Sequence, residues 1–313
     1  MIFSRCSTRI SLAGGSTDLQ AFVDKYGYGS VISFPCDLYT YITLFKDKHG
    51  CNNLNTYLLN YTRREEAEDS KKIHNDVARE VLEHFKCEPV TLNFHSDIFS
   101  SGSGLASSSS YLINCIKTVS EHLKLSLNIW EICELGLRLE RKFNPLTGHQ
   151  DIYGCGLNGF KQMVFLRDGS VTCREFKKSF LSNFAMYLRP TLIKRSSTEV
   201  LKSVDIEKAS ELLPLVAEMR EAIISENVSK FLHLVKETWE KKKETSPLVL
   251  ENRKLSEMDY NLRKDKSVLA HKLCGAGNGG FFLIFRNQNH CQETDDIPIN
   301  IAEEAHSHFT CNG

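Results

Sequence analysis

Hydrophobic and polar residues alternate along the chain with two distinct periods, and the change from one to the other marks its most informative stretch. Residues 89–95 (PVTLNFH) alternate with the period of two that is typical of a strand. In residues 112–123, hydrophobic side chains recur three and four positions apart, which predicts a helix. Between them stands GSGLASSSS, residues 102–110. The pattern therefore predicts a strand, a Gly/Ser loop and a helix in succession.

This Gly/Ser loop is predicted to open directly into the N-terminus of the helix. Such a place offers unpaired backbone N–H groups and the positive end of the helix dipole to an anion. Gly102 and Gly104 let the backbone approach a ligand closely, and Ser107–Ser110 add hydroxyls that bond phosphate oxygens or ligate Mg²⁺. A flexible loop with an N-cap serine is the simpler interpretation, but a single serine suffices for a cap. We therefore predict phosphate binding at this loop.

The remaining periodicity predicts a mixture of strands and helices without internal repeats. The character of the chain changes near residue 180, where we place the boundary between an N-terminal domain, residues 1–180, and a C-terminal domain, residues 181–313. The predicted elements are strands at 10–12, 30–34, 39–44, 54–61 (a sheet edge), 185–188 and 281–285, a hairpin at 161–176, and helices at 71–85, 128–143, 207–243 and 251–271.

Four charged residues stand where predicted elements end. Arg9 and Asp18 bracket a glycine turn between a strand and a helix, Glu140 lies one turn before a helix breaks, and Asp151 follows in a polar loop. Each has an ordinary interpretation: an exposed arginine, a helix cap, a solvated helix side chain and a turn former. Beside a phosphate loop, the two later carboxylates become a candidate metal ligand and a candidate base. The local pattern leaves both interpretations open.

Composition narrows the class of protein without choosing a function. The chain has 313 residues, of which 41% are hydrophobic and 25% charged, with a formal net charge of 0. Nothing in these totals indicates a nucleic-acid or membrane partner, and no apolar run approaches the length of a membrane span. The 11 cysteines form no C-x-x-C pair and are typical of reduced thiols, so we expect a cytoplasmic protein. A homodimer is left open.

A second glycine-rich segment, KLCGAGNGGFFLIF, contains G-x-G-x-x-G at residues 275–280. The dinucleotide-binding fingerprint requires a strand before this motif and a helix after it. Here we predict a helix before and a strand after, so that interpretation fails. The P-loop pattern G-x-x-x-x-G-K-[ST] is absent from the sequence.

Three segments in order, TRISLAGGSTDL, SGSGLASSSS and KLCGAGNGGFFLIF, resemble the motifs of the GHMP small-molecule kinases. That resemblance implies an α+β, two-domain fold, with an N-terminal domain like ribosomal protein S5 and a C-terminal ferredoxin-like domain. The first motif, ELERKFNPLTGHQDIYG and KRSSTEVL are similar to the branch that phosphorylates D-glycero-D-manno-heptose 7-phosphate at its anomeric oxygen. Ala106 and Asn278 stand where that family more often has glycine.

The resemblance also implies a role for particular residues. Asp151 would be the catalytic base with Arg9 beside it, and Ser108 and Glu140 would hold Mg²⁺. The phosphates of ATP would be bound by Gly102, Ser103, Gly104, Leu105, Ala106, Ser107, Ser108 and Ser109. The sugar would be bound by Gly14, Gly15, Ser16, Thr17, Asp18, Gln150, Arg195, Gly277 and Asn278.

We therefore expect an ATP- and Mg²⁺-dependent kinase that phosphorylates the anomeric hydroxyl of a heptose phosphate. Phosphoryl transfer needs positioning and charge neutralisation more than covalent catalysis, and the residues above supply both. Lys194 and Arg195 are candidates for binding a phosphate already on the substrate, or are simply solvated. The alternatives are a kinase for an unphosphorylated sugar such as L-fucose or galactose, and a catalytically silent protein that binds nucleotide or sugar and regulates another.

Overall fold

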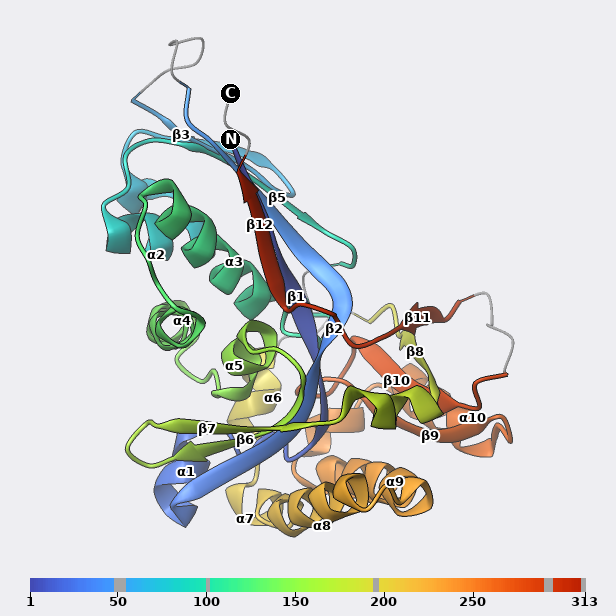
Figure 1. The fold of residues 1–313 in the computed structure, drawn as a ribbon. Coiled ribbons are helices and arrows are strands. Elements are labelled where there is room, and N and C mark those ends of the chain that lie inside the picture. The colour runs from blue at the N-terminus through green and yellow to red at the C-terminus, as the bar shows by residue number, and fades with distance from the viewer. Residues whose placement is uncertain (48–54, 100–101, 194–196, 290–294, 311–313) are drawn as a thin grey trace.

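The computed structural model describes residues 1–47, 55–99, 102–193, 197–289 and 295–310. The described chain forms two β-sheets, each covered by helices (Figure 1). The 3₁₀ helices are η1 (Ser70–Lys72), η2 (Lys178–Asn183) and η3 (Pro247–Leu250).

The first sheet has eight strands in the described residues and is built around one long strand, β2. Its order is β12-β1-β2-β5-β3-β4, and the first half of β2 also pairs with β6, which continues into β7. The strands are β1 (Ile2–Ala13), β2 (Tyr28–Phe45), β3 (Tyr57–Asn60), β4 (Arg64–Ala67), β5 (Thr91–Ser96), β6 (Phe160–Leu166), β7 (Val171–Phe176) and β12 (His306–Thr310). Because β12 comes from the end of the sequence, the chain returns to its first strand.

Helix α3 packs against β1 and β2, and further helices pack around it (Figure 1). These are α2 (Asp76–Phe85), α3 (Ser107–His122), α4 (Ile129–Phe143) and α5 (Gln150–Gly156), while α1 (Gln20–Tyr26) precedes β2. A buried polar contact fixes the start of α3: the Ser110 hydroxyl lies 2.8 Å from that of Thr40 and donates to the Cys6 carbonyl at 3.0 Å. The last serine of the run therefore anchors the helix to the sheet.

The second sheet has the order β11-β8-β10-β9, and its strands are antiparallel. They are β8 (Ala185–Pro190), β9 (Val268–Leu273), β10 (Phe281–Arg286) and β11 (Ile297–Ile299). The helices of this half are α6 (Ser197–Lys202), α7 (Ile206–Ala209), α8 (Leu212–Ile224), α9 (Val228–Glu244) and α10 (Arg253–Lys264). Helix α9 contacts both β9 and β1, so it bridges the two sheets.

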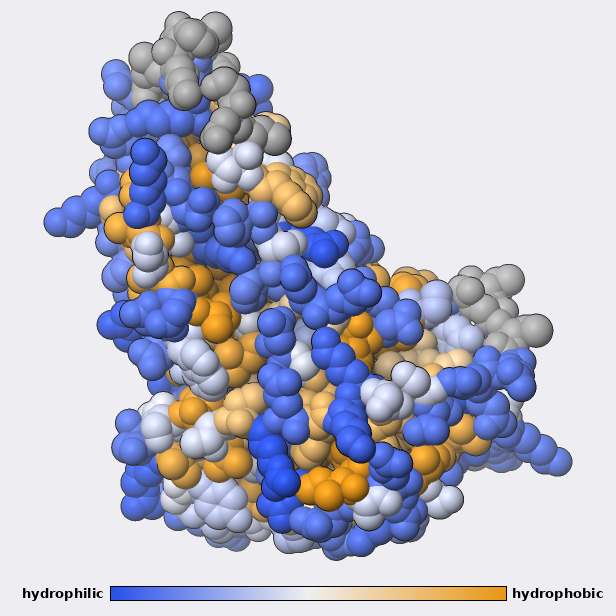
Figure 2. All heavy atoms as spheres, in the orientation of Figure 1, coloured by the Kyte–Doolittle hydropathy of each residue, from blue (hydrophilic) through white to orange (hydrophobic). Residues whose placement is uncertain are grey.

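One hydrophobic cluster joins the two halves. It combines Ile10 of β1 and Phe34 of β2 with Val216 of α8 and Leu283 of β10, all of them buried. On the face in Figure 2, polar side chains predominate and hydrophobic ones appear in separate groups. No helix in the described ranges has the length and apolarity needed to cross a membrane. The predicted division of the chain near residue 180 stays a prediction.

Several predicted elements are confirmed. The strand before the Gly/Ser loop is β5, the helix after it is α3, and the hairpin is β6–β7. Helix α4 begins with the capping box that the spacing of Asn128 and Glu131 indicates.

Other predictions are wrong in informative ways. The strands expected at 30–34 and 39–44 form the single strand β2, which contains Pro35 close to a register shift against β1. Such irregularities are where a sheet tolerates proline. The strand expected at a sheet edge, β3, lies inside the sheet because β4 pairs beyond it. The helix expected over 251–271 ends at Lys264 and is followed by β9.

Candidate active site

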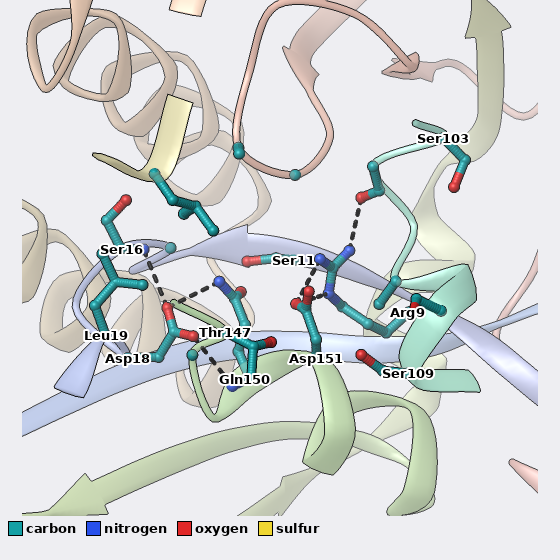
Figure 3. A pocket seen from close by; sticks show the side chains of 18 of the residues that line it. Arg9, Ser11, Ser16, Asp18, Leu19, Ser103, Ser109, Thr147, Gln150 and Asp151 are labelled. Atoms are coloured by element: carbon teal, nitrogen blue, oxygen red, sulfur yellow. Dashed lines mark hydrogen bonds and ion pairs between the residues drawn. The ribbon is translucent and has the colours of Figure 1, made fainter. Parts of the chain in front are cut away.

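A pocket between the two halves of the molecule gathers the three glycine-bearing segments. Its walls come from β1 and the turn after it, the Gly/Ser loop, and helices α4 and α5 on one side. Helix α9, strand β9 and the loop after β9 close the other side. Figure 3 shows a row of side chains across this pocket, from Ser16 and Asp18 at one end to Ser103 and Ser109 at the other.

Arg9 and Asp151 form the centre of this row (Figure 3). The Arg9 guanidinium donates to Asp151 Oδ1 from Nε at 3.0 Å and from Nη2 at 2.7 Å, and its Nη1 donates to the Gly104 carbonyl at 2.8 Å. The Arg9 side chain is buried, whereas that of Asp151 is 30% exposed and reaches the pocket. One side chain therefore joins the first motif, the Gly/Ser loop and the predicted base.

Asp151 lies in a short helix and not in the loop that the sequence predicted. Helix α5 begins at Gln150, which places both Gln150 and Asp151 in its first turn. At the other end, the buried Lys161 ammonium donates to the carbonyls of Leu157 at 2.6 Å and Gly154 at 3.3 Å. A cation at the C-terminus of a helix satisfies carbonyls that have no partner within the helix. Lys161 thereby stabilises the helix that presents Asp151.

Asp18 forms a buried acceptor site next to the central pair. Its Oδ1 accepts from the Gln150 side-chain amide at 2.8 Å and from the Ser16 backbone at 3.1 Å, and its Oδ2 accepts from the Gln150 backbone at 3.1 Å. Burial, followed by the negative charge of Asp151, raises the pKa of Asp18 to about 6. Near neutral pH the Asp18 carboxyl is mostly ionised but easily protonated, so its charge depends on the ligand beside it.

Gly148 has to be glycine because of the way Asp18 packs. A Cβ at this position would lie 1.9 Å from Asp18 Oδ2. The next residue, His149, contacts the Asp18 carbonyl with its backbone N–H at 3.2 Å and with Nδ1 at 2.9 Å. The segment before α5 and the turn after β1 thus form one rigid unit around a single carboxylate.

Glu140 is a buried carboxylate on α4 that faces the start of α3. The Ser109 hydroxyl lies 2.9 Å from its Oε1 and 2.8 Å from its Oε2. Burial, followed by repulsion from Asp151, raises the pKa of Glu140 to about 8. The predicted metal pair was Ser108 and Glu140, yet the serine in contact with Glu140 is Ser109, while Ser108 is exposed at the pocket wall. The described residues contain no group of three or more His, Cys, Asp or Glu arranged around a metal.

The Gly/Ser loop and the third motif pack directly on each other. A Cβ on Gly280 would lie 2.3 Å from the Ser103 carbonyl oxygen. Within the loop, the Ser103 hydroxyl accepts from the Leu105 N–H at 3.2 Å and lies 2.9 Å from the Ser107 hydroxyl. Ala106 adopts a left-handed conformation (φ 60°) as the residue before α3, where glycine is the least strained choice. The loop keeps its shape at a modest conformational cost.

The remaining predicted residues divide between the pocket and its support. Gly15, Ser16 and Gly104 line the pocket. Thr17 supports the turn, since its hydroxyl donates to the Gly14 carbonyl at 2.8 Å and lies 3.0 Å from the Ser30 carbonyl.

In the third motif, the pocket is lined by the neighbours of the residues that the sequence predicted. Gly275 and Ala276 line it, whereas Gly277 and Asn278 lie against Val249 of η3. Asn278 adopts a left-handed conformation (φ 59°), which asparagine tolerates better than most residues. The predicted substrate residue Arg195, with Lys194, lies outside the described residues.

Three polar side chains from the second half of the chain line the pocket without having been predicted. Thr238 and Lys242 lie one turn apart on α9, and Lys272 lies on β9. The Lys272 ammonium donates to the carbonyls of Ser11 at 2.8 Å and Leu12 at 2.9 Å. In sequence, Lys242 is the middle of a run of lysines that is typical of a solvated helix face, and only its spacing of four from Thr238 hints at a shared side.

The chain is similar to several known small-molecule kinases. A family model described as GHMP kinases N terminal domain matches residues 72–159. The D-glycero-alpha-D-manno-heptose 7-phosphate kinase of Campylobacter jejuni is 28% identical over an alignment of 299 positions that covers 88% of this chain and 87% of that protein. The L-fucokinase/L-fucose-1-P guanylyltransferase of Bacteroides fragilis is 25% identical over 335 residues, covering 91% of this chain but 34% of the larger protein.

Among solved structures, a D-glycero-D-manno-heptose 1-phosphate kinase from Bacteroides thetaiotaomicron has the same fold, with a TM-score of 0.79, 20% identity and coverage of 100% of both chains. The fold, the site and these relatives together define an ATP-dependent phosphotransferase whose acceptor is an alcohol group. Within that class, the chain is similar to the GHMP kinases: residues 72–159 match the model of their N-terminal domain, and the whole chain shares the fold of the heptose 1-phosphate kinase.

Proposed function

We propose that this protein transfers the γ-phosphate of ATP to the anomeric hydroxyl of a heptose phosphate, converting D-glycero-D-manno-heptose 7-phosphate to the 1,7-bisphosphate. The observation that carries the proposal is the position of the Arg9–Asp151 pair, with the Gly/Ser loop on one side and the Asp18–Gln150 cluster on the other. A donor and an acceptor bound at these two ends would meet at Asp151. The similarity to the Campylobacter jejuni heptose 7-phosphate kinase supports this choice of sugar.

Asp151 acts as the base in this proposal. Both hydrogen bonds from Arg9 fall on Oδ1, and we assign Oδ2 to accept the proton of the anomeric hydroxyl. The anomeric oxygen forms a bond to the γ-phosphorus while the bond from that phosphorus to the β–γ bridging oxygen breaks, and ADP leaves. Arg9 fixes the orientation of the base and places a positive charge where negative charge is transferred. An anomeric hydroxyl is more acidic than an ordinary alcohol, so a modest base is sufficient.

The Gly/Ser loop and the N-terminus of α3 are assigned to the phosphates of ATP. Ala106 precedes the helix without a side-chain cap, so the first N–H groups of α3 are available to a ligand. Glu140 and the serine hydroxyls beside it fit Mg²⁺, which prefers oxygen ligands and often takes only one or two from protein. When bound there, Mg²⁺ supplies positive charge that neutralises the phosphates. Glu140 has to lose its proton to serve as a ligand, because burial favours the neutral form.

The sugar is assigned to the Asp18 end of the pocket. Sugar hydroxyls are hydrogen-bond donors, and the Asp18 carboxylate and the Gln150 side chain are held in place to receive them. A kinase for an unphosphorylated sugar is the second candidate, because the B. fragilis relative is an L-fucokinase. A silent binding protein is disfavoured by the intact Arg9–Asp151 pair.

ATP turnover against a panel of heptoses, hexoses and their terminal phosphates tests the proposal, with ³¹P NMR locating the new phosphate. We expect turnover with heptose 7-phosphate and a signal for an anomeric phosphate. Preferred turnover of L-fucose or galactose would favour the second candidate. If no sugar stimulated ADP formation above that of an Asp151→Asn variant, the kinase assignment would be refuted.

A further inference from the structure

We propose that Lys242, with Thr238 and Ser16, forms a subsite for the phosphate that the acceptor sugar already carries. This inference rests on the proposed sugar kinase function and goes beyond it, because it identifies how the enzyme distinguishes a sugar phosphate from a sugar. The three residues, named here the α9 subsite, come from α9 and from the turn after β1.

The order of groups across the pocket places the α9 subsite at the correct end. In Figure 3, Ser103 and Ser109 lie at one end, Arg9 and Asp151 between, and Asp18 and Ser16 at the other end. The hydroxyl that receives phosphate must lie at Asp151, next to the Gly/Ser loop. The rest of the sugar then extends past Asp18, and its far end reaches Ser16. The Lys242 ammonium is at that end, since it donates to the Ser16 hydroxyl at 2.5 Å.

The polar groups of the α9 subsite are buried, and one of them, the Thr238 hydroxyl, makes no hydrogen bond within the described residues. Lys242 is 7% exposed and Thr238 is 2% exposed, and both line the pocket. The hydroxyl oxygen of Ser11, which also lines the pocket, likewise makes no hydrogen bond within the described ranges. Buried polar atoms without partners are uncommon and cost free energy. The oxygens of a phosphate would accept from the Thr238 hydroxyl and from the Lys242 ammonium.

The positive charges around this end favour a doubly charged ligand. Burial, together with the nearby charges of Lys242 and Arg9, lowers the pKa of Lys272 to about 8. Lys242 and Lys272 repel each other, whereas Arg9 is already paired with Asp151, and a dianionic phosphate beside the two lysines would relieve their repulsion. Asp18, which accepts from the Ser16 backbone, has its negative charge stabilised by hydrogen bonds from the Gln150 amide and the Ser16 N–H. A neutral sugar end would not reduce the repulsion between these two lysines.

The test compares two substrates, heptose 7-phosphate and the unphosphorylated heptose, in three variants. Lys242→Met removes the charge and keeps the length of the side chain, and Thr238→Val removes only the hydroxyl. The matched control is Lys241→Met, because Lys241 is the adjacent lysine on α9 and pairs at the surface with Glu211 at 2.6 Å. Steady-state kcat and KM are measured for both sugars and for ATP, and calorimetry measures sugar binding without turnover.

We expect Lys242→Met to raise the KM and the dissociation constant for heptose 7-phosphate ~10- to 100-fold, which is the range for loss of a charge-assisted hydrogen bond. Thr238→Val should raise them by roughly 2- to 10-fold, and Lys241→Met should have no effect. The preference for the phosphorylated sugar should collapse in Lys242→Met while the KM for ATP stays constant.

Three results would overturn the inference: an equal loss for both sugars, a rise in the KM for ATP in place of the sugar, or the same effect in Lys241→Met. The rise in the KM for ATP would assign Lys242 to the nucleotide phosphates. These outcomes are separate from failure of the proposed function, in which wild type would turn over no sugar at all. In that case, calorimetry with heptose 7-phosphate still decides whether Lys242 binds its phosphate.

Discussion

Replacing Glu140 by glutamine should make the fold more stable, and increasingly so as the pH rises. Glu140 is 2% exposed, and its pKa is raised from 4.5 to about 8, mainly by burial. The folded protein therefore binds a proton that the unfolded chain has already released between these two pH values. Stability must fall as the pH rises through this window, relative to a side chain that is always neutral. Glutamine is such a side chain, and its carbonyl can still accept from Ser109.

The magnitude follows from the two pKa values. Each pKa unit corresponds to about 1.4 kcal/mol. The raised pKa of Glu140 therefore lowers the free energy of unfolding by roughly 5 kcal/mol above pH ~8, by about 3 kcal/mol near neutrality, where folding requires uptake of a proton, and by close to nothing at pH ~4.5. These are upper values, because a buried charge relaxes its surroundings and draws in water.

Urea unfolding of wild type and of Glu140→Gln at several pH values between about 5 and 9 measures the difference in the free energy of unfolding. The two proteins should be similar at the acid end, and the variant should be several kcal/mol more stable at the alkaline end. Glu134→Gln is the control, since Glu134 lies exposed on the same helix. Mg²⁺ should stabilise wild type by displacing the proton from Glu140, and this effect should be lost in Glu140→Gln. A pH-independent difference between the two proteins would refute the reasoning.

Three further outcomes follow from the site. Asp151→Asn should lower kcat by ~10²- to 10⁴-fold with an unchanged KM for ATP, and near-normal turnover in a single-turnover assay would remove Asp151 as the base. Gly148→Ala should destabilise the fold by about 1–3 kcal/mol and raise the KM for the sugar, because the added Cβ would displace Asp18. Urea unfolding measures the change in stability and steady-state kinetics the change in KM, and a variant with wild-type values of both would contradict the packing described. Ser109→Ala removes a hydrogen-bond donor that favours the ionised form of Glu140, so it should raise the Mg²⁺ concentration needed for half-maximal activity. Ser108→Ala is the comparison. A larger effect of Ser108→Ala would support the pairing of Ser108 with Glu140 that was expected from the sequence.

Much of the fold follows from the local pattern of hydrophobic residues. The elements that this pattern misses are too short to show a period, continue the period of a neighbouring helix, or depend on distant parts of the chain. Periodicity predicts β5, α3, α4 and the β6–β7 hairpin, because each buries one face or stripe of its own residues. It fails over α5, whose seven residues are too few for a clear period, and over β9, where Leu262 and Ala270 continue a hydrophobic spacing across the end of a helix. It also misses β12, whose pairing with β1 depends on strands about 300 residues apart.

The sequence by itself determined the three glycine-bearing segments and the acids beside them, because short motifs constrain the backbone locally. Only the tertiary structure decided which of those groups meet. Arg9 and Asp151 are 142 positions apart, and Ser16 and Lys242 are 226 apart, so their contacts exist only through packing of the two sheets. Lysines 241, 242 and 243 are identical in sequence, yet only Lys242 lines the pocket. Each residue turns a helix by ~100°, so the orientation of α9 on the sheet selects the one that faces inward.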